Sequence, residues 1–218
     1  MERNITITLE KAKEWYNSDN ESLKEVVLQA FSKEELDIFD FTKIKTFEDA
    51  LLCFYKFQSD EYYSTIESVC RLRIVSMASA AMFQLNIIRK ALNLDQDLHL
   101  TKDPKDSHIY YPYNPFVMKN STSYKSELNS GRMEVIGKIK NEGEEYNVLG
   151  GCAGCCSGTG LSCFRPYRGV GFTDAVVGFL GCATEEIAQH FGKYFGMLIM
   201  EAKYADMVDF EIVENKYQ

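Results

Sequence analysis

The residues best suited to chemistry lie in one short run, Leu149-Gly-Gly-Cys-Ala-Gly-Cys-Cys-Ser-Gly-Thr-Gly-Leu161, which holds three of the seven cysteines and five of the fourteen glycines. Cysteine can bind a metal ion, attack an electrophile or fill a small apolar space, and glycine lets the backbone pass where side chains do not fit. The three uses of cysteine predict three different kinds of protein.

The first use is a metal site. Cys152 and Cys155 form a C-x-x-C pair, the spacing found in zinc knuckles and in redox dithiols. The candidate ligands are Cys152, Cys155, Cys163 and Cys182, with Cys156 and His190 as further donors. A zinc site typically has a second closely spaced pair, and a redox dithiol lies between a strand and a helix; neither pattern is present. We therefore expect no metal and no cofactor, and interpret these cysteines as small apolar residues of a buried, glycine-rich strand.

The second use is nucleophilic catalysis, which needs a histidine within hydrogen-bonding reach of the thiol. His99 and His108 fall in a polar connector, and His190 falls in a predicted helix, where a partly exposed structural role is the simpler interpretation. The glycines match neither G-x-x-x-x-G-K-[ST] nor a G-x-G-x-x-G that opens a helix, so they predict a turn and close backbone packing. We assign no catalytic residue and expect the protein not to be an enzyme.

Two other segments suit contacts with proteins. The stretch Ile109–Met118 is aromatic and broken by two prolines, which is typical of an edge strand or an extended surface arm. Its candidate contact residues are Tyr110, Tyr111, Tyr113 and Phe116, which we do not expect all to be buried. Arg165, Tyr167 and Arg168 form a compact basic and aromatic patch that either grips a carboxylate of a partner or lies in a solvated loop.

The predicted secondary structure that positions these residues changes near residue 95, from helices to mainly strands. Apolar spacing and capping residues predict short helices beginning after Thr8, after Asp19 or Asn20, after Ser32 and after Thr46. Apolar residues at steps of three to five then predict one long central helix from about Ser64 to Leu92.

The second part reads as a sheet with a final helix. Residues 133–140 and 145–149 flank Asn141-Glu-Gly-Glu144, a β-hairpin signal, and residues 161–164, 175–180 and 210–213 are further strand candidates. Residues 124–131 are predicted to form a loop, and Thr184 begins the last helix. The predicted class is α+β, with N-terminal helices and then a mainly antiparallel sheet covered by the C-terminal helix. We expect one compact domain over residues 1–218, helical in 1–95 and containing the sheet and final helix in 96–218.

The net charge of the chain and its expected cellular location limit the classes of partner that it can bind. With 32 acidic and 24 basic residues the formal charge is −8, which argues against direct binding of nucleic acid. No apolar stretch reaches the ~20 residues that span a bilayer, and the first residues lack the pattern of a secretory signal. Seven cysteines in such a chain favour reduced thiols, and we expect a cytoplasmic protein with no membrane contact.

Six segments of the chain form a pattern: Ile5-Thr-Ile-Thr-Leu-Glu-Lys-Ala-Lys-Glu-Trp-Tyr16, Leu28-Gln-Ala-Phe-Ser32, Ile44-Lys-Thr-Phe-Glu-Asp-Ala50, Leu85-Asn-Ile-Ile-Arg-Lys-Ala-Leu-Asn93, Tyr110-Tyr-Pro112 and Gly178-Phe-Leu-Gly-Cys182. With these segments nearly the whole chain resembles a group of uncharacterised small proteins from tailed phages, prophages and genomes of gut Bacteroidota. Residues 60–75 and 119–131 depart from the pattern of that group. The resemblance implies a phage or mobile-element setting and no particular activity, cofactor or catalytic residue.

Together these observations predict a non-enzymatic structural or interaction protein, located in the host cytoplasm or incorporated into the virion. Its expected partners are other phage or host proteins, or copies of itself. Two alternatives remain open: a small intracellular modulator of host defence that acts by binding, and a cysteine-centred metal-binding protein or enzyme.

Overall fold

A computed structural model describes residues 7–18, 20–33, 35–94, 108–119, 121–122, 124–157, 180–207 and 209–217. The chain divides into two compact units, Met1–Asp40 and Phe41–Gln218, where the sequence analysis expects one domain over residues 1–218. Each unit is described by itself.

The first unit is a small helical pair. Helix α1 (Leu9–Tyr16) begins after Thr8 and helix α2 (Glu21–Ala30) after Asn20, and both capping side chains accept hydrogen bonds from the first turn, as predicted. The core of this unit consists of Ala12, Val27 and Leu36, with Ile7, Trp15, Tyr16, Phe31 and Ile38 packed against it.

The helix predicted after Ser32 does not form. Ser32 and Glu35 do make the reciprocal capping hydrogen bonds, at 2.8 and 3.2 Å, but the described residues that follow are turns. A cap satisfies only the first amides, and helix growth also needs an apolar face to bury. A 3₁₀ turn, η1 (Phe41–Lys43), comes next instead, and helix α3 (Phe47–Leu52) then begins at the predicted capping box of Thr46 and Asp49.

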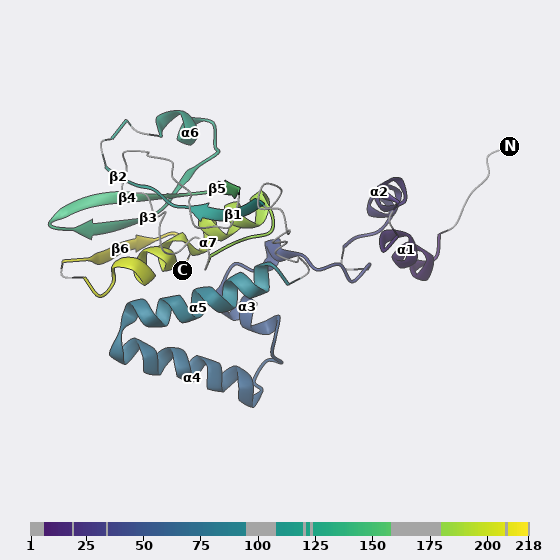
Figure 1. Ribbon diagram of the computed structural model, residues 1–218, viewed down its shortest axis with the longest axis horizontal. Coiled ribbons are helices and arrows are strands. Elements are labelled where there is room, and N and C mark those ends of the chain that lie inside the picture. The colour runs from purple at the N-terminus through teal and green to yellow at the C-terminus, as the bar shows by residue number, and fades with distance from the viewer. Residues whose placement is uncertain are drawn as a thin grey trace. The chain divides into compact units, whose positions relative to one another are not determined.

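The predicted long helix is wrong: it is two helices, α4 (Asp60–Val75) and α5 (Met77–Leu92), joined at Ser76 and packed against each other (Figure 1). The backbone of Ser76 is extended (φ −160°, ψ 119°), and its hydroxyl accepts from the amide of Ser79 at 2.9 Å. Ser76 therefore caps α5. The apolar spacing continues through the break because both helices bury one face, so periodicity alone does not reveal it.

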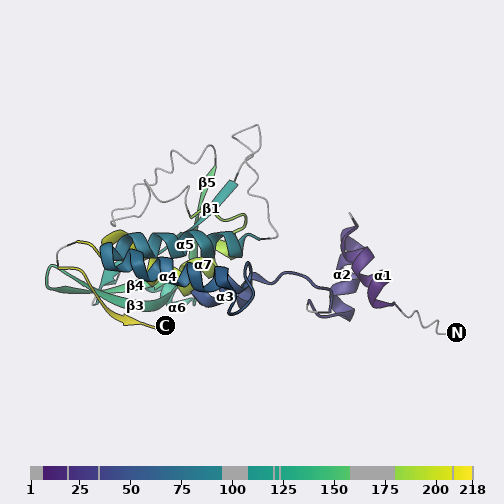
Figure 2. The same ribbon diagram turned by 90° about the horizontal axis from the view of Figure 1, so that it is seen from below.

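The strands of the described residues form two separate antiparallel sheets. Their bounds are β1 (His108–Tyr113), β2 (Phe116–Met118), β3 (Glu134–Asn141), β4 (Glu144–Gly150), β5 (Cys152–Ser157) and β6 (Glu211–Asn215). Strands β1 and β5 pair with each other, and the larger sheet has the order β2-β4-β3-β6. Figure 2 shows β1 and β5 standing apart from β3 and β4.

The predicted hairpin is present. Asn141 pairs with Glu144 across a two-residue turn in which Glu142 and Gly143 both have positive φ (52° and 84°), which matches the twist of the strands. Part of the loop predicted over 124–131 is instead a short helix, α6 (Lys125–Asn129). The candidate strand at 161–164 lies outside the described residues, as does 175–179 of the next candidate.

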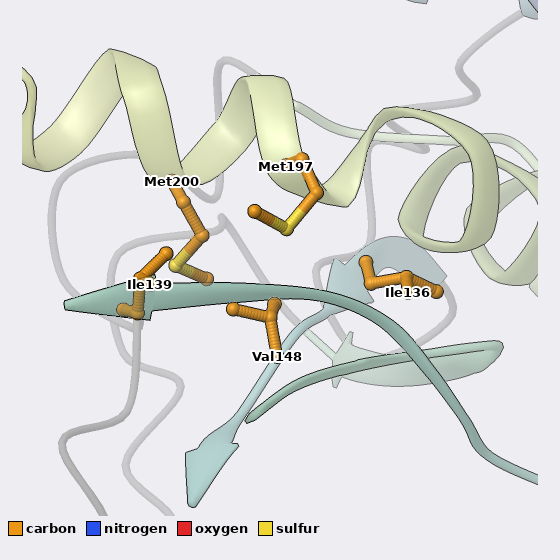
Figure 3. Close-up of a cluster of buried hydrophobic side chains, with 5 residues drawn as sticks. All are labelled: Ile136, Ile139, Val148, Met197 and Met200. Carbon is orange, nitrogen blue, oxygen red and sulfur yellow. The ribbon is translucent and has the colours of Figure 1, made fainter. Parts of the chain in front are cut away.

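Helix α7 (Glu185–Tyr204) begins after Thr184 as predicted and is the centre of the second unit. It contacts α5 on one side and strands β3, β4 and β6 on the other, and eleven of its 20 residues are buried. Ile136, Ile139, Val148, Met197 and Met200 pack together between this helix and the sheet (Figure 3). The α+β class, with an antiparallel sheet covered by the C-terminal helix, is confirmed.

Candidate interaction surface

The aromatic residues predicted to contact partners are integrated into the fold. Tyr110, Tyr111, Tyr113 and Phe116 are all half-buried. Strand β1 pairs with β5 along its length, and the ring of Phe116 meets those of Tyr146 and Tyr204 edge-on, at 5.3 and 6.1 Å between centroids. None of the four is fully buried, in agreement with the expectation that they are not all buried, and of the two predicted forms the segment adopts the edge strand. Their contact with a partner stays a prediction.

A buried asparagine holds the connection between β1 and β2 against the rest of the fold. Nδ2 of Asn114 donates to the carbonyl oxygens of Leu149 (2.9 Å) and Gly192 (2.7 Å), which joins the β1–β2 connection to β4 and α7. A Cβ at Gly196 would lie 2.4 Å from that nitrogen, so the two glycines of α7 make room for it. This contact was not predicted from the sequence, where its signal is an asparagine between two prolines together with glycines four apart in a helix.

The structure describes only some of the candidate cysteine ligands. Cys152 and Cys155 belong to strand β5, and their side chains lie outside the described residues. Cys182 is buried, and loss of solvation raises the pKa of its thiol to about 12. Cys163 lies outside the described residues, and among those described no group of three or more His, Cys, Asp or Glu side chains is placed to hold a metal ion.

His190 has a structural contact. Its Nε2 lies 2.7 Å from the carbonyl oxygen of Ile44, which can only accept, so this nitrogen carries the proton. The ring also packs edge-on against Phe41, at 5.5 Å between centroids. This agrees with the interpretation of His190 as a partly exposed helix residue.

An open cavity of about 290 Å³ lies beside His190 and contains several charged groups. Glu134 accepts hydrogen bonds from Lys193 (2.7 Å), Lys216 and Tyr217. Partial burial alone would raise the pKa of this carboxyl, but the three donors outweigh it and hold the pKa at about 2. Glu134 and Lys193, two of the charged residues that line the cavity, therefore pair with each other, and we assign no ligand to the cavity.

The end of the α4–α5 hairpin differs from the rest of the described surface. Ile74 is 87% exposed and Val75 is 85% exposed, more than any other large apolar residue described. Met77 (41%) and Met207 (55%) are also exposed, and they flank the point where Asp206 meets the first turn of α5. We call Ile74, Val75, Met77 and Met207 the tip patch.

Two long-range polar contacts fix this end of the hairpin against α7. The carboxylate of Asp206 accepts from the hydroxyl of Ser76 and from the amide of Met77 (3.0 Å), and the Ser76 hydroxyl is the main reason that the pKa of Asp206 is lowered. One turn earlier, Arg73 donates to Oε1 of Glu201 at 2.6 Å, and the Glu201 side chain is only 6% exposed. The tip patch therefore belongs to a packed element and not to a frayed helix end.

The patch at Arg165, Tyr167 and Arg168 lies outside the described residues, and its two interpretations remain predictions. None of the described helices is both long and apolar enough to cross a membrane. No protein-family model matches the sequence, and no curated protein or solved structure is significantly similar to it.

Proposed function

We propose that this protein is a non-enzymatic interaction protein that docks onto another protein subunit through the tip patch. The observation that carries the proposal is the pair Ile74 and Val75, two consecutive aliphatic residues that are almost fully exposed on an anchored helix. Burying an aliphatic side chain is worth about 1.5–3 kcal/mol, and folding of this chain gains almost none of that from either residue.

The polar contacts that fix the end of the α4–α5 hairpin support a binding role for the exposed residues of the tip patch. Contacts from Asp206 and Glu201 hold the hairpin end in one arrangement, so a partner that covers the tip patch would not have to order it first. Exposed apolar side chains grouped on a rigid element are typical of contact surfaces between proteins.

The setting of the proposal comes from the sequence. Resemblance to proteins of tailed phages and prophages favours a virion or assembly component acting in the host cytoplasm or in the virion. A modulator of host defence that acts by binding would use the same kind of surface.

The test compares the native size of the protein in extracts of cells that carry its gene. Ile74→Gln with Val75→Gln replaces both aliphatic side chains by polar ones and improves helix propensity, so folding is preserved. The matched control, Thr122→Gln with Asn129→Gln, changes two exposed residues near α6. The expected result is that the wild-type and control chains elute well above the 25.0 kDa of one chain, and that the tip variant elutes as a single chain. Elution of the wild type as one chain, or an unchanged size in the tip variant, would contradict the proposal.

A further inference from the structure

The first unit, Met1–Asp40, buries little apolar surface for its size. Among its described residues only Ala12, Val27 and Leu36 form the buried core, and the five apolar residues packed against them stay partly open to solvent. Chains of about 40 residues rarely bury enough surface to fold without a disulfide, a metal ion or a partner. The unit has no cysteine, and no group of three of its described acidic side chains is placed to hold a metal ion. An added element that packs on this unit would therefore supply stability that its own core lacks.

Helix α2 has an apolar stripe that is mostly uncovered. Leu23, Val26, Val27 and Ala30 are spaced by three, one and three residues, which is the spacing of one apolar helix face. Only Val27 is buried; Leu23 is half-buried, and Val26 (46%) and Ala30 are exposed. We call Leu23, Val26 and Ala30 the α2 stripe. A further helix packed along this stripe would extend the core of the unit beyond Val27.

The charge of the unit indicates the chemistry of that further helix. Residues 1–40 hold ten of the 32 acidic residues of the chain but only five of the 24 basic ones, and pairing within the unit does not change this surplus. The ion pairs of the unit are Lys11 with Glu14, Lys13 with Asp37 and Lys24 with Glu21. The exposed Glu25, next to Val26, has no such cation among the described residues. A helix that carries Lys or Arg beside its apolar residues is therefore attracted to this unit.

We propose that Met1–Asp40 is a second docking module, which binds a cationic amphipathic helix of a partner protein along the α2 stripe. The apolar side chains of the partner helix cover the stripe, and its Lys or Arg side chains approach Glu25. Because the bound helix completes the core, it stabilises the unit as well as attaching it to the partner. This inference goes beyond the proposed function, since the tip patch belongs to the other unit.

Trp15 allows this unit to be followed within the full chain. It is the only tryptophan of the protein, and its half-buried side chain packs against the core of the first unit. Tryptophan fluorescence therefore reports the unfolding of Met1–Asp40 in urea, whereas circular dichroism reports mainly the larger unit. We expect the fluorescence transition at the lower urea concentration, because the first unit buries so little. Coincident transitions would overturn the premise that this unit lacks a sufficient core.

The probe is a synthetic peptide of about 20 residues, long enough to form a helix when bound. It consists of Leu, Lys and Ala in an order that gives one apolar and one cationic face, and it contains no tryptophan. Added to the purified full chain, it is expected to shift the Trp15 transition to higher urea and to leave the circular-dichroism transition in place. A peptide of the same composition in scrambled order, and one with Glu in place of Lys, are expected to have no effect.

Two matched substitutions in α2 test the position of the contact. Val26→Gln is expected to raise the dissociation constant of the cationic peptide at least about fivefold, because it removes the most exposed aliphatic side chain of the stripe. Leu28→Gln changes a residue of similar exposure, 44%, on the other side of the same helix and is expected to leave the dissociation constant unchanged. Both substitutions keep good helix propensity.

A second pair tests the charge. Glu25→Lys is expected to weaken binding at least about fivefold. Glu144→Lys makes the same change at an exposed position of the β3–β4 hairpin and is expected to have no effect, although the net charge of the two variants is equal. Equal losses in the two charge variants would reduce the contact to general attraction by an acidic chain and would overturn the inference.

Three further results would refute the inference: a cationic peptide that leaves the Trp15 transition unchanged, equal binding of the Glu peptide, or equal losses in Val26→Gln and Leu28→Gln. The variant Ile74→Gln with Val75→Gln is expected to bind the peptide as the wild type does. Reduced binding in that variant would assign the peptide to the tip patch and refute its assignment to the first unit.

Discussion

The guanidinium of Arg73 in α4 donates a hydrogen bond of 2.6 Å to the carboxylate of Glu201 in α7, across 128 residues of sequence. The Arg73 side chain is 53% exposed, whereas that of Glu201 is almost completely buried. This contact joins α4, the outer helix of the hairpin, to α7 and fixes the position of the neighbouring Ile74 and Val75. A neighbouring pair, Arg71 with Glu67, has similar geometry but lies entirely on the surface.

The two arginines should therefore differ in their effect on stability. Arg73→Leu leaves a buried carboxylate without its cation and is expected to lower the free energy of unfolding by about 1–3 kcal/mol. Arg71→Leu removes an exposed pair and is expected to change it by less than about 0.5 kcal/mol. Urea unfolding of both variants measures this, and equal effects would show that the contact with Glu201 contributes no more than a surface ion pair.

Substitution of the two glycines Gly192 and Gly196 in α7 should also differ in its effect on stability. A Cβ at position 196 would approach both Asn114 Nδ2 and Ile136 Cδ1 to 2.4 Å, whereas at position 192 the nearest atom, in Pro112, lies 3.2 Å away. Gly196→Ala is expected to lower the free energy of unfolding by about 1–3 kcal/mol despite the better helix propensity of alanine.

Gly192→Ala serves as the comparison and is expected to lower the free energy of unfolding by less, because the neighbouring atoms need to move only slightly to accommodate the new Cβ. Thermal unfolding monitored by circular dichroism ranks the two variants. If Gly196→Ala stabilises the protein, the close approach of Asn114 to α7 is incorrect.

Acid should weaken the fold through Glu134. Its pKa is about 2 in the folded protein and about 4.5 without the fold, so the carboxylate contributes stability that is fully present above about pH 4.5 and is lost as the pH falls towards 2. Glu134→Gln is expected to be less stable than the wild type near neutral pH, and the difference should vanish as the pH approaches 2. Denaturant unfolding at a series of pH values checks this, and a difference that stays constant with pH would contradict it.

Thiol reactivity should follow burial. Cys70 is exposed, whereas burial raises the pKa of Cys182 to about 12 and keeps its thiol protonated and shielded. Brief treatment of the native protein with iodoacetamide, followed by peptide mass spectrometry, is expected to find Cys70 modified and Cys182 unmodified. Denaturation should remove the difference, and rapid native modification of Cys182 would indicate an open and reactive thiol.

The sequence was sufficient wherever local chemistry decides the structure. Capping side chains at Thr8, Thr46 and Thr184 mark true helix starts, and the Glu142-Gly143 turn places the hairpin correctly, because these signals depend on a few neighbouring residues. The class follows from the order of such elements.

The sequence does not reveal those features of the fold that depend on contacts between residues far apart in the chain. The break at Ser76 is stabilised by Asp206, which is 130 residues away, and the tyrosines of β1 are half-buried because β5 and α7 cover them. The tip patch was missed for the same reason: Ile74 and Val75 fit a buried helical pattern, and only the packed structure shows that nothing in the described chain covers them.

The most direct test of the docking surface is photo-crosslinking in cells that carry the gene, with a photoreactive amino acid at position 75 and, as a control, at the exposed position 144 in the β3–β4 hairpin. We expect a discrete cross-linked product from position 75 and none from position 144. A product at twice the mass of the chain would identify a second copy of this chain as the partner, and a product of another mass would identify a different subunit. The absence of any product at position 75 would contradict the account.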